Sequence, residues 1–204
     1  MTARTVLFGG TFDPVHNAHL SVAHAALSRF DPKCILFVPA ARPPHKGGGA
    51  HASFEDRAAM LDLACAGEPR FQVSRIERPG RKTDPPSYSI LTIEKLLTDG
   101  QGPLDFLIGA DAFAEIRSWH RWGELIHLVE FIVVTRPGAV YEVPPGAVVH
   151  ELGGLELPES SSAIRAELQK GSERVPVPPA VLSWIRSHGL YRAPVTELAN
   201  NFKA

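Results

Sequence analysis

Short runs of apolar residues alternate along this chain with segments whose apolar residues recur every three or four positions. The unbroken runs are typical of strands buried on both faces, and the wider spacing is typical of amphipathic helices. The runs occupy residues 6–8, 34–38, 71–74, 104–108 and 131–135, with 148–149 as a further short candidate. Helical spacing begins at Asn17 and returns at 54–66, 90–97, 160–170 and 179–188.

This alternation predicts an α/β fold with a Rossmann-like, open, mostly parallel sheet and helices on both faces. We expect one domain over residues 1–192, in which 160–192 is a C-terminal helical part, and a disordered tail over 193–204. Ser53 and Ser87 are the expected N-caps of the helices that follow them.

Composition adds mainly exclusions. The chain has 204 residues, 44% of them hydrophobic, with a formal charge of -1 and a pI near 6.8. Without a basic field no nucleic-acid partner is expected, so phosphate recognition must be local. No signal-like segment or long apolar run occurs, so we expect no membrane partner and a cytoplasmic location. Cys34 and Cys65 are expected to be buried like apolar residues.

Candidate chemistry gathers where the first strand ends. Gly9 and Gly10 allow a sharp turn and the close approach of a ligand. A strand, a glycine turn and a helix start suit phosphate, because free N–H groups and the helix dipole meet there. His16 and His19 are expected on one face of the first helical turn. This stretch therefore predicts a phosphate site.

Two later segments suit the same chemistry. Gly109 ends the strand at 104–108 and Asp111 follows, so this strand repeats the first design. Ligands of parallel sheets gather beyond the carboxyl ends of the strands, so we expect the two ends to share one crevice. Serine hydroxyls open a helix at 160–162, and Arg165 follows one turn later, where its guanidinium could fork onto phosphate oxygens.

A loop and an aromatic cluster complete the candidates. His45 and Lys46 lie in a loop rich in proline and glycine, which is either a lid over an anionic substrate or a solvated linker. Residues 118–122 form an aromatic and basic cluster. Nucleotidyl transfer needs positioning and charge neutralisation, which histidines and an arginine at helix N-termini supply, with Mg²⁺ bridging phosphate oxygens.

The opening loop carries a motif that resembles a known signature. Residues 9–19 read Gly-Gly-Thr-Phe-Asp-Pro-Val-His-Asn-Ala-His, close to the nucleotidyltransferase superfamily pattern G-[GS]-[TS]-F-[DN]-P-x-[HT]-x-G-H. Ala18 departs from it, because glycine is usual there. The spacing fits neither a P-loop nor a dinucleotide fingerprint, which disfavours an NAD-dependent dehydrogenase.

Further segments resemble bacterial nicotinate-nucleotide adenylyltransferases over almost the whole chain. They are 9–19, 43–46, 87–89, 109–111 with Trp119, 136–138, 160–165 and 189–191. The resemblance implies ATP and nicotinate mononucleotide as partners, and AMP transfer between them by in-line attack, giving deamido-NAD and pyrophosphate. It also implies Mg²⁺ held mainly by ATP phosphates and water, with no metal held by the protein alone. A homo-oligomer stays open.

The same resemblance implies roles for individual residues. His16, His19 and Arg165 would be catalytic. The ATP side would comprise Gly9, Gly10, Thr11, Phe12, His16, His19, Gly109, Asp111, Ser161, Ser162 and Arg165. The nicotinate mononucleotide side would comprise His45, Lys46, Tyr88, Ser89, Trp119 and Arg136. Asp111 would hold a ribose, and Trp119 would stack on the pyridine ring.

Departures from the family pattern keep alternatives open. Ala18, Glu159 and Ser162 stand where glycine, isoleucine and threonine are usual, and Glu159 places a negative charge near the expected phosphate site. The alternatives are an adenylyltransferase for nicotinamide mononucleotide or phosphopantetheine, and a glycerol-phosphate cytidylyltransferase. A further alternative is a catalytically inactive regulator that binds nucleotides, and the departures at Ala18 and Glu159 would favour it.

Overall fold

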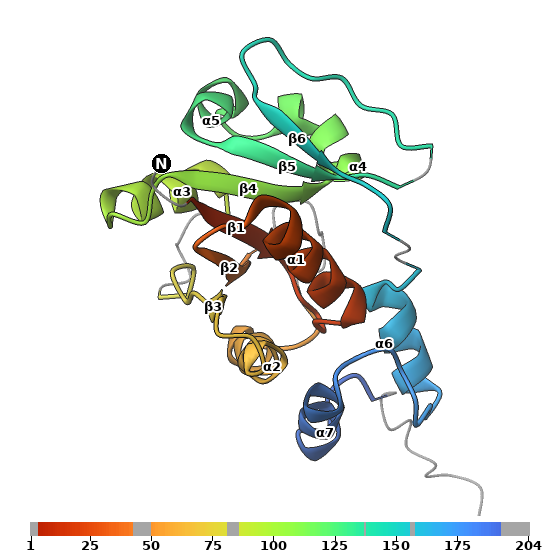
Figure 1. The fold of residues 1–204 in the computed structure, drawn as a ribbon. Helices are drawn as coiled ribbons and strands as arrows, with labels where there is room; N and C mark the ends of the chain where they lie inside the picture. The colour runs from red at the N-terminus through yellow and green to blue at the C-terminus, as the bar shows by residue number, and fades with distance from the viewer. Residues whose placement is uncertain (1–3, 43–49, 81–85, 137, 156–157, 193–204) are drawn as a thin grey trace, which may run out of the picture.

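The computed structural model describes residues 4–42, 50–80, 86–136, 138–155 and 158–192, and its centre is a parallel β-sheet (Figure 1). The strands are β1 (Thr5–Gly10), β2 (Cys34–Pro39), β3 (Phe71–Val73), β4 (Leu104–Gly109), β5 (Glu130–Val134) and β6 (Val149–Leu152). They lie in the order β3-β2-β1-β4-β5-β6, and every neighbouring pair is parallel. The predicted α/β fold with an open parallel sheet is confirmed.

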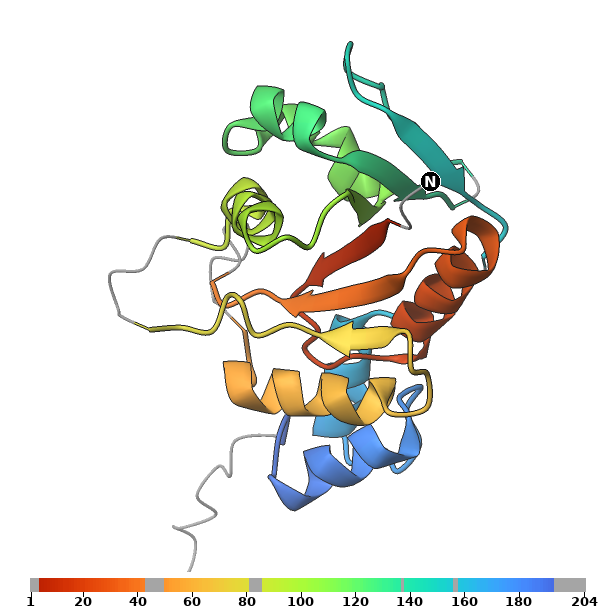
Figure 2. The ribbon, with the colours of Figure 1, turned by 60° about the vertical axis from the view of Figure 1, so that its left-hand side comes forward.

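Helices cover both faces of the sheet, as predicted (Figure 2). One face packs with α1 (Asn17–Phe30), α2 (Phe54–Cys65), α6 (Ser161–Gln169) and α7 (Pro179–Ser187). The other packs with α3 (Ser89–Thr98), α4 (Ala110–Ala114), the 3-10 turn Ile116–Ser118 and α5 (Trp122–Leu128). The C-terminal helices α6 and α7 therefore share the core of the first face, with α7 beside α2 (Figure 1).

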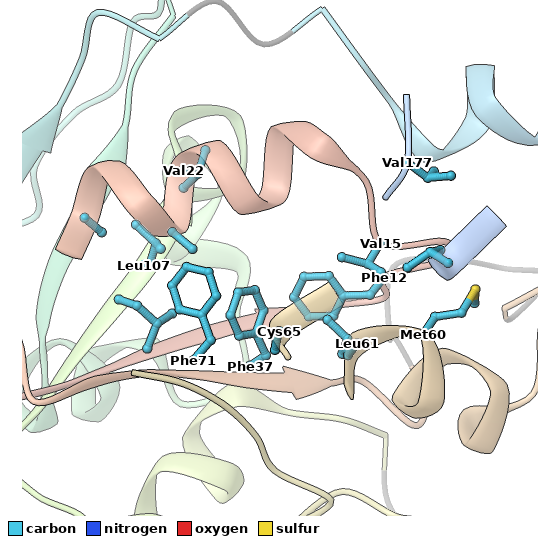
Figure 3. Packing of buried hydrophobic residues seen from close by; sticks show 14 of the residues in the cluster. Phe12, Val15, Val22, Phe37, Met60, Leu61, Cys65, Phe71, Leu107 and Val177 are labelled. Atoms are coloured by element: carbon cyan, nitrogen blue, oxygen red, sulfur yellow. The ribbon is translucent and has the colours of Figure 1, made fainter. Parts of the chain in front are cut away.

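Alternate residues of the central strands enter opposite hydrophobic clusters. Val6 of β1 belongs to the cluster of α1 and α2, whereas the next residue, Leu7, belongs to that of α3 and α5. Figure 3 shows the first cluster, in which the rings of Phe37 and Phe71 meet edge to face with centroids 5.3 Å apart. Burial on both faces is why these strands are unbroken apolar runs.

Two smaller predictions have different outcomes. Cys34 and Cys65 are buried and unpaired, as expected, and burial raises the pKa of the Cys65 thiol to about 12. Ser53 caps α2 as predicted, because its hydroxyl accepts the Asp56 N–H at 3.0 Å. The N-cap prediction for Ser87 was wrong.

The residue at the N-cap of α3 is Tyr88, whose side chain makes no capping hydrogen bond. The Ser87 hydroxyl instead accepts the backbone N–H of Arg42 at 2.9 Å. This long-range bond ties the start of α3 to the chain after β2. Tertiary contact thus replaces local capping at this helix start.

The order of the strands reverses between β1 and β4. From β1 the chain moves outward to β2 and β3, then returns to β4 on the other side of β1. The two strands pair with Phe8 opposite Leu107, so Gly10 and Gly109 end them at the same edge of the sheet. Such a switch point leaves a crevice beyond the strand ends, which is where the sequence predicted one.

Candidate active site

The loop between β1 and α1 turns tightly and brings two histidines beyond the strand end. Phe12 takes a left-handed φ of 50°, and its ring is 2% exposed. A Cβ at Gly10 would lie 3.0 Å from that ring, so a side chain there would require the ring to shift. The Phe12 ring also meets His19 edge to face, with centroids 5.0 Å apart. Phe12 was predicted to belong to the ATP side; its ring lies in the core and packs against His19.

His16 and His19 form a close pair at the start of α1. His16 is the N-cap residue, and the two rings lie 3.8 Å apart with a 31° angle between their planes. The backbone N–H of His16 donates to Nδ1 of His19 at 3.2 Å. A neutral His19 with Nδ1 as acceptor carries its proton on Nε2. The loop backbone therefore sets which nitrogen of His19 can donate.

His16 is buried and electrically neutral near pH 7. The residue is 5% exposed, and burial lowers its pKa to about 4, although the charge of Glu159 acts in the opposite direction. Its Nδ1 is buried and has no hydrogen-bond partner among the described residues. A buried ring nitrogen left without a partner is suited to meet a ligand.

A cavity of about 410 Å³ opens beside this pair, and we call it the histidine cavity. The residues predicted for the ATP side that line it are His16, His19, Gly109, Asp111, Ser161 and Ser162. They come from the start of α1, from the end of β4 and the helix α4 that follows it, and from the start of α6. The departures Ala18 and Glu159 line it too. The fold thus brings the widely separated phosphate candidates together.

Arg165 lies beside the histidine cavity but is not among the described residues that line it. Its Nη1 donates to the carbonyl oxygen of Asp13 at 2.7 Å, and its Nη2 lies 3.5 Å from the Ser162 hydroxyl. The Ser161 hydroxyl donates to the carbonyl oxygen of Pro14 at 3.0 Å. The start of α6 is therefore bonded directly to the loop that carries the histidines.

A second cavity, of about 360 Å³, lies on the other side of the β1 end, and we call it the tryptophan cavity. Tyr88, Ser89 and Trp119 line it, as expected for one substrate side. Gly9, Gly10 and Thr11, expected on the ATP side, also line it. Phe8 and Gly109 line both cavities, so the two spaces adjoin at the switch point.

The structure does not place all the residues predicted for the mononucleotide side in the tryptophan cavity. Arg136 lies on the wall of the histidine cavity, together with Asp111 and the serines of α6. His45 and Lys46 lie outside the described residues. The structure therefore unites Tyr88, Ser89 and Trp119 but separates Arg136 from them.

Two residues of the site carried no role in the sequence prediction. Asp13 is buried, and its carboxylate accepts several hydrogen bonds beneath the histidine loop. Its place inside the motif was the available signal. His120 lines the tryptophan cavity and stacks on Tyr88, with centroids 4.3 Å apart. Its signal was the aromatic cluster around Trp119.

Neither a metal cluster nor a membrane span is found in the part of the chain that the structure describes. No three His, Cys, Asp or Glu side chains there gather in a way that could hold a metal ion. None of the described helices is long and apolar enough to cross a bilayer.

A parallel sheet with a histidine pair and a helix start meeting at its switch point is the architecture of a nucleotidyltransferase. Residues 7–167 match the cytidylyltransferase-like family. A relative from Solibacter usitatus, named "probable nicotinate-nucleotide adenylyltransferase", is 50% identical over 92% of this chain and 99% of its own length. A relative of the same name from Acidothermus cellulolyticus is 38% identical over 93% of this chain and 95% of its own length. The chain belongs to the nicotinate-nucleotide adenylyltransferase family, which confirms the resemblance read from its motifs.

Solved structures agree on the fold. The Plasmodium falciparum nicotinic acid mononucleotide adenylyltransferase, complexed with NaAD, superposes with a TM-score of 0.70 at 19% identity, over 92% of this chain and 96% of that one. A putative nicotinate-nucleotide adenylyltransferase from Vibrio parahaemolyticus superposes with a TM-score of 0.64 at 18% sequence identity, over 94% of this chain and 97% of that one. At these identities the likeness supports the fold alone.

Proposed function

We propose that this protein transfers AMP from ATP to nicotinate mononucleotide, releasing pyrophosphate and forming deamido-NAD. The pair of cavities that adjoin at Phe8 and Gly109 carries the proposal. Nucleotides in the two cavities would bring an acceptor phosphate to the α-phosphate of ATP beyond the strand ends. The name of a relative that shares half of its residues with this chain points to the same reaction.

ATP is assigned to the histidine cavity. The amides at the start of α6 would meet the β- and γ-phosphates beside Ser161 and Ser162, because a helix N-terminus attracts anions. Asp111 could accept hydrogen bonds from ribose hydroxyls. Arg136 is reassigned to the triphosphate, because it shares this cavity. Arg165, held next to Ser162, would reach phosphate oxygens from the side of α6.

The chemistry asks for positioning and for stabilisation of charge. The acceptor phosphate is already ionised, so it attacks the α-phosphorus in line without a general base, and pyrophosphate departs. His16, neutral at pH 7, would act as a hydrogen-bond donor rather than as a cation. His19 would donate from Nε2 to the charge that develops on the α-phosphate.

Mg²⁺ fits this site as a partner of the nucleotide. The described wall of the histidine cavity carries only two carboxylates, Asp111 and Glu159, which suits a cation that keeps phosphate and water ligands. When bound, Mg²⁺ supplies positive charge that stabilises the leaving pyrophosphate.

Nicotinate mononucleotide is assigned to the tryptophan cavity. Trp119 would stack on the pyridine ring, and the first amides of α3 near Ser89 would meet the nicotinate carboxylate. Among the described residues that line this cavity, only His120 can carry a positive charge. Glu77 lines the same cavity with a carboxylate, so the preference for the acid substrate is assigned to the amides at the start of α3.

A panel of acceptors tests the assignment. The purified protein is given ATP and Mg²⁺ with nicotinate mononucleotide, nicotinamide mononucleotide or phosphopantetheine, and pyrophosphate and adenylylated product are measured. We expect the highest kcat/KM with nicotinate mononucleotide. Robust turnover of phosphopantetheine with none of nicotinate mononucleotide would reject the proposal. Replacing ATP by CTP tests the cytidylyltransferase alternative.

One observation favours a second candidate, a regulator that binds ATP without transferring AMP. Glu159 lies on the wall of the histidine cavity, where its charge opposes a triphosphate. A single-turnover assay separates the candidates, because a regulator would bind ATP and release no pyrophosphate. We expect pyrophosphate in amounts close to that of the enzyme.

We also propose a cytoplasmic location, supported by two buried cysteines that form no disulfide. The formation of a homo-oligomer stays a prediction. Sedimentation of the purified chain at several concentrations would test it.

A further inference from the structure

Side chains from distant segments hold the backbone of the loop at residues 11–16, which leads into α1. Its carbonyl oxygens at Thr11, Asp13 and Pro14 accept hydrogen bonds from Arg57, Arg165 and Ser161, at 2.7, 2.7 and 3.0 Å. Arg57 belongs to α2 and is 1% exposed, and the other two donors belong to α6. In Figure 3, Phe12 and Val15 of the same loop lie near Leu61 of α2. The loop backbone is thus fixed by both polar and apolar contacts.

The Asp13 carboxylate is the polar centre of this arrangement. It is 2% exposed and accepts the backbone N–H groups of His51 and Ala52 at 2.7 and 3.1 Å. The ring Nδ1 of His51 also lies 3.3 Å from Oδ2, and the hydroxyl of Tyr191 donates to Oδ1 at 2.7 Å. Burial raises the pKa of Asp13, but these hydrogen bonds and the charge of Arg165 outweigh it and hold the pKa below its usual range. Asp13 therefore stays ionised.

Tyr191 reaches Asp13 across 178 positions of the chain. Its ring is 9% exposed and packs in the cluster that contains α1, α2 and α7. Without its hydroxyl, one oxygen of the carboxylate would lose a donor. The other oxygen already lies 4.0 Å from Nη1 of Arg165, so the carboxylate could then compete with the Asp13 carbonyl for this guanidinium. Such a shift would move both Arg165 and the loop that begins α1.

We propose that Tyr191 is a positioning residue for the transfer reaction: its hydroxyl orients the Asp13 carboxylate and thereby aligns Arg165 and the histidine loop. The inference rests on the proposed function, since it takes His16, His19 and Arg165 to act on the nucleotide. The end of the chain is thus part of the support of a site whose motif lies at its start.

The test compares two removals of a tyrosine hydroxyl. Tyr191→Phe removes the bond to Asp13, whereas Tyr141→Phe removes an equally long bond to Glu151, on the surface. For Tyr191→Phe we expect kcat to fall about 10-fold with the KM for the mononucleotide within 2-fold, because misalignment acts on the transition state. The acid limb of its pH profile should move to higher pH, because the pKa of Asp13 rises when a donor is lost. Tyr141→Phe should change neither.

Hydrogen exchange supplies a readout that does not depend on turnover. Tyr191→Phe should speed amide exchange in residues 11–19 while the central strands keep wild-type protection. If the wild type makes no deamido-NAD, the proposed function fails, but faster exchange in 11–19 would still support the positioning role. Asp13→Asn is the second variant, with the same expected losses. The inference would be overturned if folded Tyr191→Phe kept the kcat, the pH profile and the amide exchange of residues 11–19 of the wild type, whatever its melting temperature.

Discussion

The two histidines of the opening loop have rings only 3.8 Å apart, but their surroundings suit them to different contacts. His16 is enclosed and neutral, with an unpartnered buried nitrogen. His19 is partly exposed, and its Nδ1 already accepts the His16 backbone, which leaves Nε2 as its donor. Because Phe12 supports the His19 ring, this donor has a defined direction. Transition-state stabilisation depends on donors oriented in advance.

Replacing His19 by alanine tests that donor. We expect His19→Ala to lower kcat by about 10²–10⁴-fold with a smaller change in substrate binding, since the donor acts on transition-state charge. Steady-state kinetics with both substrates measures the two effects. His24→Ala, at an exposed position of the same helix, is the matched control and should keep wild-type turnover. Unchanged turnover in His19→Ala would remove His19 from the mechanism.

Trp119 should act on binding of the mononucleotide. The ring lines the tryptophan cavity and meets Phe106 edge to face, with centroids 6.1 Å apart. We expect Trp119→Ala to raise the KM for the mononucleotide about 10-fold and to leave the affinity for ATP nearly unchanged. Trp122→Ala, three residues on and not in the described lining of either cavity, serves as the control. An effect on the KM for ATP alone would contradict the assignment.

At the scale of elements, the start of α6 combines two opposing features. Ser160 caps the helix by accepting the Ala163 N–H at 3.2 Å, and the following amides face the histidine cavity with the positive end of the helix dipole. Glu159, directly before the cap, lines the same cavity with a negative charge. The element therefore attracts a triphosphate less strongly than its geometry allows.

Neutralising that charge should improve ATP binding. We expect Glu159→Gln to lower the dissociation constant for ATP about 3-fold to 10-fold, because a repulsive charge next to the phosphates is removed. Calorimetric titration with a non-hydrolysable ATP analogue measures it. Glu173→Gln, at an exposed position after α6, is the matched control. Weaker binding in Glu159→Gln would mean that the carboxylate helps to hold the nucleotide, for example through Mg²⁺.

Elements were easier to predict than the contacts between them. The strands could be predicted because burial on both faces leaves unbroken apolar runs in the sequence. Ser53 could be predicted as an N-cap because capping acts within one helical turn. The N-cap prediction for Ser87 failed because its hydroxyl accepts a hydrogen bond from the backbone N–H of Arg42, 45 positions away in the sequence. The bond between Asp13 and Tyr191 has no local signature at all. Motifs thus predicted several residues that line the two cavities, among them His16, His19 and Trp119, but not the contacts that hold them in place.

At the scale of the whole molecule, folding places a histidine where it cannot easily be charged. The pKa of His16 is lowered from 6.5 to about 4 because the ring is buried. Between pH 6.5 and about pH 4, His16 therefore binds a proton in the unfolded chain but not in the folded one. The contribution of His16 to stability is therefore complete above pH 6.5, and it is lost as the pH falls towards 4.

Urea unfolding at several pH values tests this coupling between site and fold. Between pH 7 and pH 4.5 the protonation of His16 should lower the free energy of unfolding by about 2–3 kcal/mol, and His16→Asn should lack this part of the pH dependence. Subtracting the variant from the wild type removes the contribution of the carboxylates, which titrate in both. His24→Asn should follow the wild type. Equal pH slopes in wild type and His16→Asn would show that His16 can be protonated in the folded state, and would reassign it from a neutral donor to a cation at the phosphates.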